Sequence, residues 1–192
     1  MAKEHKSTTQ LKALVPLAQG CEELEAVTIT DLLTRAGMLV TTVGLDEAPV
    51  KASRGMVFVP DTTIDAVMEH AFDLMVLPGG LPGATHLQDD ARIQKKLKTM
   101  EAEKKVVAAI CAAPKALASA GLLTNKKYTC YPNSMDDGLA DKALYSETSV
   151  VIDGNVVTSR GPGTAIDFTL SLIEMLLGQN KRIEVEKPLL RS

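Results

Sequence analysis

Short apolar runs alternate with amphipathic segments along most of this chain. Runs of aliphatic and β-branched residues predict buried strands, and segments whose apolar residues recur at helical spacing predict helices. The strands are expected at 11–18, 38–45, 72–77, 105–110 and 128–131, and the helices at 21–36, 65–70, 89–104, 114–120, 165–177 and 181–186. This strand–helix–strand order predicts an α/β fold with a mostly parallel central sheet, right-handed crossovers and helices on both faces.

Two segments have the pattern of hairpins rather than of single strands. Residues 50–60 are extended around Ser53-Arg54-Gly55, and residues 150–159 place Asp153-Gly154 between two β-branched runs. The second is the clearer hairpin signal. Pro16 lies inside the first expected strand, which an edge position or a strand end would allow. Residues 134–143 predict a polar loop or a weak helix.

The stretch around Cys111 combines a buried strand, a sharp turn and a helix. The apolar run 105–110 stops at Cys111, and Pro114 suits the first turn of the Ala-rich helix that follows. Such a turn places the sulfur near the positive end of a helix, which would lower the thiol pKa. Cys111 can equally be an ordinary buried thiol, because free cysteines are often buried.

Composition narrows the class of protein. The 192 residues suit one domain covering 1–192, with residues 1–10 expected to form a polar, flexible N-terminus. The formal net charge is −3 and no basic stripe is present, so nucleic acid is a poor candidate partner. No apolar run approaches the ~18 residues of a membrane span, and no signal-peptide pattern is present. A cytoplasmic location is expected.

The three cysteines, Cys21, Cys111 and Cys130, lie far apart without metal-ligand spacing. They predict neither a disulfide framework nor a metal site. Glycines follow the strand at 72–77, and sites in open α/β sheets form at the carboxyl ends of strands. The N–H groups of Gly80 and Ala112 are therefore candidate donors to an anionic intermediate at Cys111.

Five motifs together resemble one family. Their combination and order are similar to the ThiJ/PfpI superfamily, and within it to the DJ-one/YajL-like branch, the parkinsonism-associated deglycase and chaperone family. The similarity covers about residues 11–190. The motifs are AxGxEExE at 18–25, SRG at 53–55, LPGG at 77–80, AAICAAP at 108–114 and TSRGPGT at 158–164.

The resemblance implies a flavodoxin-like sandwich, a homodimer and a strained nucleophile elbow that carries Cys111 as a readily oxidised thiol. Glu25 is then its acidic partner, and we expect a protonated Glu25 that donates a hydrogen bond to the thiolate. Glu22 and Glu23 better fit helix-end carboxylates. The family pattern also places Arg54 and Arg35 near the pocket rim and the subunit interface, and Pro162 in the pocket wall.

Two departures from the family pattern bear on mechanism. Many superfamily members have a histidine directly after the nucleophile, where this chain has Ala112, so peptidase activity is disfavoured. Tyr131 occupies the position of a common pocket histidine, and a tyrosine does not titrate near neutrality. His86 is expected in a solvated loop. Cys21 and Cys130 are expected to be packing residues, with a resolving-cysteine role as the alternative.

Two functions remain in competition. The first is a cofactor-independent glyoxalase III and deglycase, which converts small dicarbonyls such as methylglyoxal and glyoxal, or their adducts, to 2-hydroxy acids through Cys111 and Glu25. It requires no metal and no organic cofactor. The second is an oxidative-stress sensor or redox-controlled chaperone, in which Cys111 is oxidised to a sulfinate without significant turnover. A role in thiamine biosynthesis rests mainly on the names of similar sequences.

Overall fold

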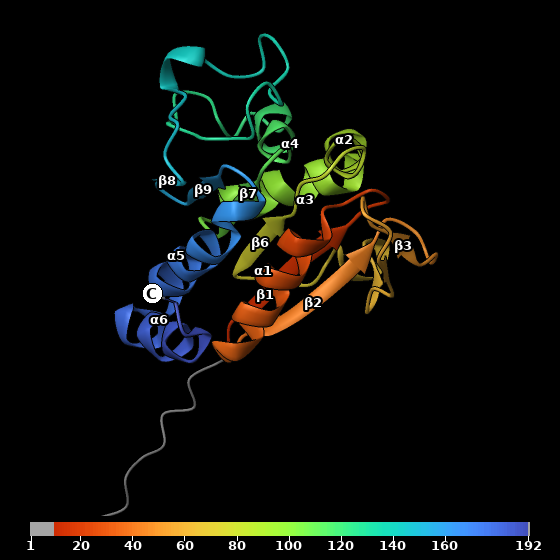
Figure 1. The fold of residues 1–192 in the computed structure, drawn as a ribbon. Coiled ribbons are helices and arrows are strands. Elements are labelled where there is room, and N and C mark those ends of the chain that lie inside the picture. The colour runs from red at the N-terminus through yellow and green to blue at the C-terminus, as the bar shows by residue number, and fades with distance from the viewer. Residues whose placement is uncertain (1–9, 192) are drawn as a thin grey trace, which may run out of the picture.

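The computed structural model describes residues 10–191, and a seven-stranded sheet forms their centre (Figure 1). The strand order is β5-β2-β1-β6-β7-β9-β8, and every neighbouring pair is parallel except β9 with β8. The mostly parallel sheet of a flavodoxin-like α/β fold is therefore confirmed. Its strands are β1 (Lys12–Leu17), β2 (Leu39–Gly44), β5 (Thr62–Thr63), β6 (Leu74–Leu77), β7 (Val106–Ile110), β8 (Val150–Asp153) and β9 (Val156–Ser159).

Helices cover both faces of this sheet (Figure 1). Leu74 and Val76 of β6 pack with one set of helices, and Met75 and Leu77 pack with the other, because successive side chains of a strand point to opposite faces. The first set is α1 (Glu23–Arg35) and α5 (Ala165–Leu177), with α6 (Gln179–Glu186) packed on α5. The second set is α2 (Gly83–Asp89), α3 (Ala91–Ala102) and α4 (Pro114–Ser119).

Most elements lie where the apolar pattern predicts them. Helix α5 has the expected bounds, and Gly178, with φ at +87°, follows its last residue. Both expected hairpins form: β3 (Val50–Lys51) pairs antiparallel with β4 (Val57–Phe58), and β8 pairs with β9. The remaining elements are short 3-10 helices, η1 (Asp65–Val67), η2 (Lys142–Leu144), η3 (Pro162–Thr164) and η4 (Lys187–Leu189).

Pro16 lies in an interior strand, so the edge position considered for it is wrong. It is the residue before the last of β1, and the pairing of β1 with β6 stops at Leu14 with Met75. The missing N–H of Pro16 therefore lies beyond the last residue pair between β1 and β6. Pro16 is tolerated because it lies near the end of the strand, which was the other explanation offered for it.

Two local predictions fail, and one short strand was not predicted. Residues 83–89 form helix α2 rather than a loop, so His86 is exposed on a helix. This helix is short and has no side-chain N-cap, so the sequence carries no start signal for it. The strand expected at 128–131 is reduced to one bridge between Tyr128 and Tyr145, and the two-residue strand β5 was not expected.

The chain between α4 and β8 projects beyond the sheet, as the green-to-cyan segment of Figure 1 shows. Within it, residues 134–143 form mostly loop, and only η2 is helical, in agreement with the polar pattern. No helix of the described part of the chain has the length and apolar character needed to cross a membrane. A flexible N-terminus is expected at 1–10. Residues 1–9 lie outside the described part of the chain.

Candidate active site

The ends of three neighbouring strands bring the candidate residues together. Strands β1, β6 and β7 are adjacent and parallel, so the turns after them lie at one edge of the sheet. The turn after β1 leads into α1, which carries Glu25, and the turns after β6 and β7 contain Gly79 and Cys111. A hydrogen bond joins the turn after β1 to the turn after β6: the Glu22 N–H donates to the Gly79 carbonyl at 2.9 Å.

Cys111 lies at a sharp strand-to-helix turn. Its φ is +63°, in the left-handed region that costs a non-glycine residue on the order of 1–3 kcal/mol. Two hydrogen bonds hold this backbone: the Cys111 N–H donates to Ser159 O at 3.0 Å, and the Tyr131 N–H donates to Cys111 O at 2.7 Å. Pro114 is the first residue of α4, as predicted. The surrounding structure therefore fixes a conformation that cysteine alone would avoid.

Glu25 is completely buried in the first turn of α1. Its Oε2 accepts a hydrogen bond from the Gly79 N–H at 2.7 Å. Its Oε1 is also buried and has no hydrogen-bond partner of normal geometry among residues 10–191. Glu22 caps the same helix, since its carboxylate accepts from the Glu25 N–H at 2.8 Å. Glu22 thus has the helix-end role predicted for it, and Glu25 has one oxygen free to exchange a proton.

Gly79 leaves room for Glu25 and Cys111 to approach each other. A Cβ on Gly79 would lie 2.6 Å from Cys111 Cβ and 2.9 Å from Glu25 Oε2. Both distances are too short for a side chain at position 79. Glycine at this position therefore permits the close approach of Glu25 and Cys111. Glu25 and Cys111 therefore lie close together beside one glycine, and each shifts the pKa of the other.

Burial raises the pKa of the Glu25 carboxyl to about 7. The hydrogen bond from Gly79 and the Cys111 thiol oppose this rise, and the nearby Glu22 carboxylate adds to it. Loss of water is the dominant cause, because it disfavours the charged form of a carboxyl. Glu25 therefore changes its protonation state near neutral pH, which suits a group that both accepts and donates protons.

Burial also raises the pKa of the Cys111 thiol, to about 12, and the Glu25 carboxylate adds to the rise. The backbone N–H groups of Gly80 and Ala112 lower it. The net direction is opposite to the one predicted from a helix N-terminus. The reason is that desolvation and a neighbouring carboxylate outweigh two N–H donors. A thiolate at Cys111 is then most stable when Glu25 is protonated, because two adjacent negative charges repel each other.

The two expected backbone donors lie next to the sulfur. The N–H groups of Gly80 and Ala112 both stabilise negative charge on it, as their effect on its pKa indicates. Gly80 has φ at +86°, and a Cβ there would lie 2.4 Å from Glu22 N. Only glycine fits this turn, because any side chain would meet the backbone of the turn after β1.

Tyr131 and Pro162 line one open surface hollow of about 240 Å³, and Cys111 is not among its lining residues. The hollow adjoins the Cys111 turn through the backbone, because the Tyr131 N–H donates to Cys111 O. The side chain of Tyr131 is 51% exposed.

Of the two expected arginines, Arg35 lies away from the thiol. Arg35 is in the last turn of α1, ten residues after Glu25, which is about 15 Å along a helix. It pairs with Asp31 at 2.7 Å, and both side chains are about half exposed, so Arg35 does not line the pocket. Arg54 is exposed in the turn between β3 and β4.

Sequence reasoning missed the role of Glu23. Its carboxylate accepts from Ser53 Oγ at 3.0 Å and from the Arg54 N–H at 2.8 Å. These bonds tie the β3–β4 turn to the start of α1 and lower the Glu23 pKa, although desolvation opposes them. The adjacent acidic residues in the sequence signalled helix capping only, so this contact between distant segments was not foreseeable.

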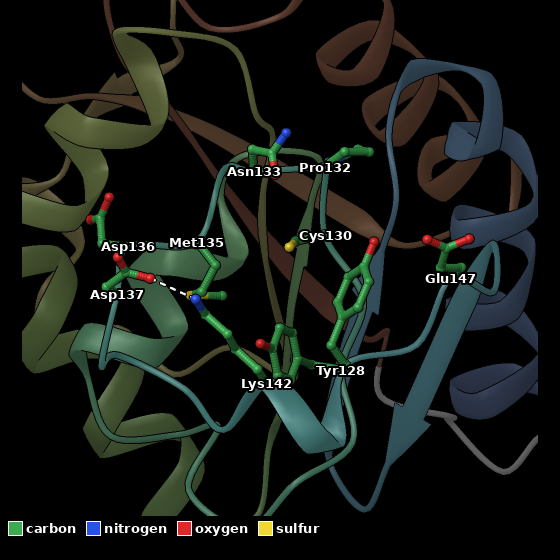
Figure 2. Close-up of a pocket in the computed structure, with 10 residues that line it drawn as sticks. Tyr128, Cys130, Pro132, Asn133, Met135, Asp136, Asp137, Lys142 and Glu147 are labelled. Carbon is green, nitrogen blue, oxygen red and sulfur yellow. Dashed lines mark hydrogen bonds and ion pairs between the residues drawn. The ribbon is translucent and has the colours of Figure 1, made fainter.

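The other two cysteines occupy different surroundings. Cys21 is fully buried, and burial with the nearby Glu23 raises its pKa to about 11. Cys130 is also buried, and its sulfur points into a separate cavity of about 650 Å³ (Figure 2). This cavity is lined by the projecting segment, including Tyr128, Met135 and Tyr145. All three cysteines are free thiols.

The exposed His86 and the acidic residues do not form a metal centre. His86 Nδ1 lies 3.2 Å from Gln19 O, at the turn after β1. Within residues 10–191, no three His, Cys, Asp or Glu side chains are grouped so that they could hold a metal ion.

Comparison with known proteins agrees with this architecture. The sequence profile of the DJ-1/PfpI family matches residues 11–175. The Parkinson disease protein 7 homolog of Danio rerio is 42% identical over 93% of this chain and 96% of its own length. Protein DJ-1 homolog B of Arabidopsis thaliana is 43% identical over 95% of this chain, which spans only 42% of that longer relative.

A third relative and a solved structure extend the comparison. The glutathione-independent glyoxalase DJR-1.2 of Caenorhabditis elegans is 35% identical over 94% of this chain and 96% of its own length. The structure of oxidized Toxoplasma gondii DJ-1 superimposes with a TM-score of 0.90 and 38% identity, covering 95% of this chain and 99% of that one. By sequence and by fold, this chain belongs to the DJ-1/PfpI family.

Proposed function

We propose that the protein is a cofactor-independent glyoxalase III that converts small 2-oxoaldehydes such as methylglyoxal and glyoxal to 2-hydroxy acids. The observation that carries the proposal is the pairing of Cys111 with a buried Glu25 whose pKa is about 7. A thiol with a raised pKa is a poor nucleophile until a base removes its proton, and Glu25 is a base suited to neutral pH.

In the first step, Cys111 Sγ bonds to the aldehyde carbon of the substrate. The thiol proton moves to Glu25 and then to the aldehyde oxygen, which gives a hemithioacetal with no net change in charge. The N–H groups of Gly80 and Ala112 stabilise the oxygen while it is negative, because they already favour negative charge at the sulfur.

In the second step, Glu25 removes the proton from the former aldehyde carbon. The resulting enediol takes a proton at the neighbouring carbon, which gives a 2-hydroxy thioester on Cys111. Water then cleaves the carbon–sulfur bond and releases the 2-hydroxy acid and the free thiol. Glu25 is the proton carrier in each step, so one carboxyl with a pKa near neutrality is sufficient. The reaction needs no metal and no organic cofactor.

A relative named as a glutathione-independent glyoxalase supports this reaction type. Deglycase activity needs one further bond change: Cys111 Sγ replaces the amine or thiol on the adduct carbon, and that group leaves with the proton that Glu25 took from Cys111. The same hemithioacetal results. Peptidase activity is not proposed, since Ala112 follows Cys111 where a histidine would have to act as base.

The proposal is tested by replacing each of two buried thiols in turn. We expect Cys111→Ser to abolish conversion of methylglyoxal to lactate, measured by chromatography of the product. Cys130→Ser, which alters a thiol in a separate cavity, should keep the rate within about twofold. Undiminished lactate formation by Cys111→Ser would overturn the proposal.

The alternative is a redox sensor or redox-controlled chaperone. It is favoured by the same donors: a sulfinate at Cys111 would accept hydrogen bonds from the Gly80 and Ala112 N–H groups and from protonated Glu25. A relative solved in a form described as oxidized is consistent with it. Selective addition of two oxygens at Cys111 under mild peroxide, with negligible glyoxalase turnover, would favour this alternative.

We also propose a homodimer in a reducing cytoplasm, where three free cysteines persist. The β3–β4 turn is tied to the start of α1, and exposed apolar side chains lie on both: Leu24, Val27, Met56 and Val57. A neighbouring set of this kind is typical of an interface. Val27→Glu should yield monomers in sedimentation, whereas Ile152→Glu on β8 should not.

A further inference from the structure

A cavity of about 650 Å³ opens in the projecting segment between α4 and β8 (Figure 2). Its volume lies within the ~300–1,000 Å³ that is typical of small-molecule sites. Neither Cys111 nor Glu25 is among its lining residues, so it is separate from the candidate active site. The reaction proposed above makes no use of it.

The inner surface of this cavity is aromatic and apolar. The rings of Tyr128 and Tyr145 lie with their centroids 5.8 Å apart at an interplanar angle of 59°. Met135 packs against the buried core beside them, and the buried Cys130 contributes its sulfur. Aromatic faces and sulfur contact apolar groups favourably, and aromatic faces also attract cations. The cavity therefore offers a contact surface for an aromatic or apolar group.

The hydroxyl of Tyr128 is a polar group that such an occupant would meet. Tyr128 is only 2% exposed and lines the cavity, yet its hydroxyl forms no hydrogen bond with any other residue of the described range 10–191. Buried polar groups normally have a hydrogen-bond partner. The phenol oxygen can accept a hydrogen bond, so a ligand with an N–H donor would satisfy it.

The charged side chains around the cavity are mostly acidic. Asp136, Asp137 and Glu147 line it, and Lys142 is the only cation of the lining. Lys142 Nζ is paired with Asp137 at 2.7 Å. Arg160, which is not part of the lining, has Nη2 3.9 Å from the Glu147 carboxylate and offsets part of its charge. The surplus of carboxylates favours a positively charged occupant.

The arrangement of these acids suits an organic cation better than a metal ion. Asp136 and Glu147 lie on opposite sides of the cavity in Figure 2. In the described part of the chain, no three His, Cys, Asp or Glu side chains are grouped closely enough to hold a metal ion. A hard metal ion needs about six oxygen ligands around one point, whereas an ammonium group needs one acceptor for each N–H.

We propose that this cavity binds organic ammonium compounds with an aromatic body. The ammonium group donates to the Tyr128 hydroxyl and is favoured by the surrounding carboxylates, while the ring packs against Tyr145 and Met135. The inference goes beyond the glyoxalase function and does not depend on it, because binding here involves neither Cys111 nor Glu25.

Benzylammonium, benzyl alcohol and phenylacetate are the probes, since they share one ring and differ in charge. Isothermal titration calorimetry of the wild-type protein at neutral pH should give benzylammonium the lowest Kd, on the order of 1 mM, and phenylacetate the highest. Tyr128→Phe removes only the hydroxyl and should raise the Kd for benzylammonium about three- to tenfold. Tyr131→Phe is the matched control: Tyr131 does not line the cavity, so this Kd should stay within about twofold.

Glu147→Gln tests the role of charge separately. The Glu147 side chain is 76% exposed, so this variant decides the matter if Tyr128→Phe fails to fold. It should raise the Kd for benzylammonium about two- to fourfold and leave the Kd for benzyl alcohol unchanged. Equal Kd values of the three probes for wild type, or no saturable binding of benzylammonium, would overturn the proposal. So would a Kd for benzylammonium that neither Tyr128→Phe nor Glu147→Gln changes.

Discussion

Cys111 and Cys130 are both buried, and burial raises the pKa of both thiols, yet their surroundings differ. Cys111 lies in a turn with φ at +63°, beside a buried carboxyl whose pKa is about 7. Cys130 lies in the projecting segment and lines a cavity (Figure 2), and Ser134 and Arg160 partly offset the rise in its pKa that burial causes. The backbone of Cys111 is strained and fixed, whereas Cys130 has an allowed backbone.

The proposed function makes Cys111 the reactive cysteine, and neither its burial nor its thiol pKa sets it apart from the other two cysteines. Cys21, with a pKa raised to about 11, has the same kind of shift as Cys111. What distinguishes Cys111 is a neighbour that can take its proton at neutral pH and two N–H groups that favour the resulting charge. The proton acceptor, rather than the thiol alone, defines the site.

The largest expected effect comes from removing that acceptor. Glu25→Gln keeps the shape of the side chain but cannot accept the thiol proton, so kcat/KM for methylglyoxal should fall by about 100- to 10,000-fold. Glu22→Gln, on the same turn, keeps an oxygen that can cap α1 and should change kcat/KM by less than about threefold. Equal losses in the two variants would show that Glu25 acts only through the local fold.

The same carboxyl makes stability depend on pH. Its pKa is about 7 in the folded protein against an ordinary value of 4.5, so the folded state holds this proton more tightly than the unfolded chain. The resulting stabilisation is complete below about pH 4.5 and is lost as pH rises through about 7, an effect of up to about 3 kcal/mol. Urea unfolding between pH 5 and 8 should show a steeper decline for wild type than for Glu25→Gln. Parallel curves would contradict the buried-carboxyl assignment.

A methyl group at position 79 should collide with both Cys111 and Glu25. Gly79→Ala places a Cβ 2.6 Å from Cys111 Cβ, so we expect a loss of about 1–3 kcal/mol in the free energy of unfolding, with reduced turnover. Gly163→Ala is the matched control, since nothing described lies within 4 Å of its Cβ. It should shift stability by less than about 0.5 kcal/mol. Unimpaired stability in Gly79→Ala would mean that Glu25 and Cys111 can separate freely.

Much of the fold followed from sequence because its signals are local. The apolar runs identified the interior strands, and the pattern ending at Gly178 identified both ends of α5. Helix α2 carried no comparable signal, since it begins at Gly83 without a capping side chain. The pairing of Tyr128 with Tyr145 is a contact between distant positions of a loop, which periodicity does not report.

Some features of the candidate site were also predictable from the sequence, and others needed the structure. The Cys111 turn was visible as a strand, a cysteine and Pro114, and Glu25 entered only through the family resemblance. The hydrogen bond that Gly79 donates to Glu25 and the bonds that the Arg54 turn donates to Glu23 join segments far apart in sequence. The direction of the Cys111 pKa shift also needed the structure, because desolvation depends on how completely the surrounding elements exclude water.

The central claim is that Glu25 takes the Cys111 proton, and the pH dependence of Cys111 alkylation by iodoacetamide tests it most directly. Mass spectrometry assigns the modified cysteine at each pH, in wild type and in Glu25→Gln. The account predicts that the wild-type rate rises with a midpoint near pH 7, where Glu25 loses its proton and becomes a base. In Glu25→Gln this rise should vanish, and the rate should climb only at more alkaline pH. The same midpoint in both proteins would contradict the account.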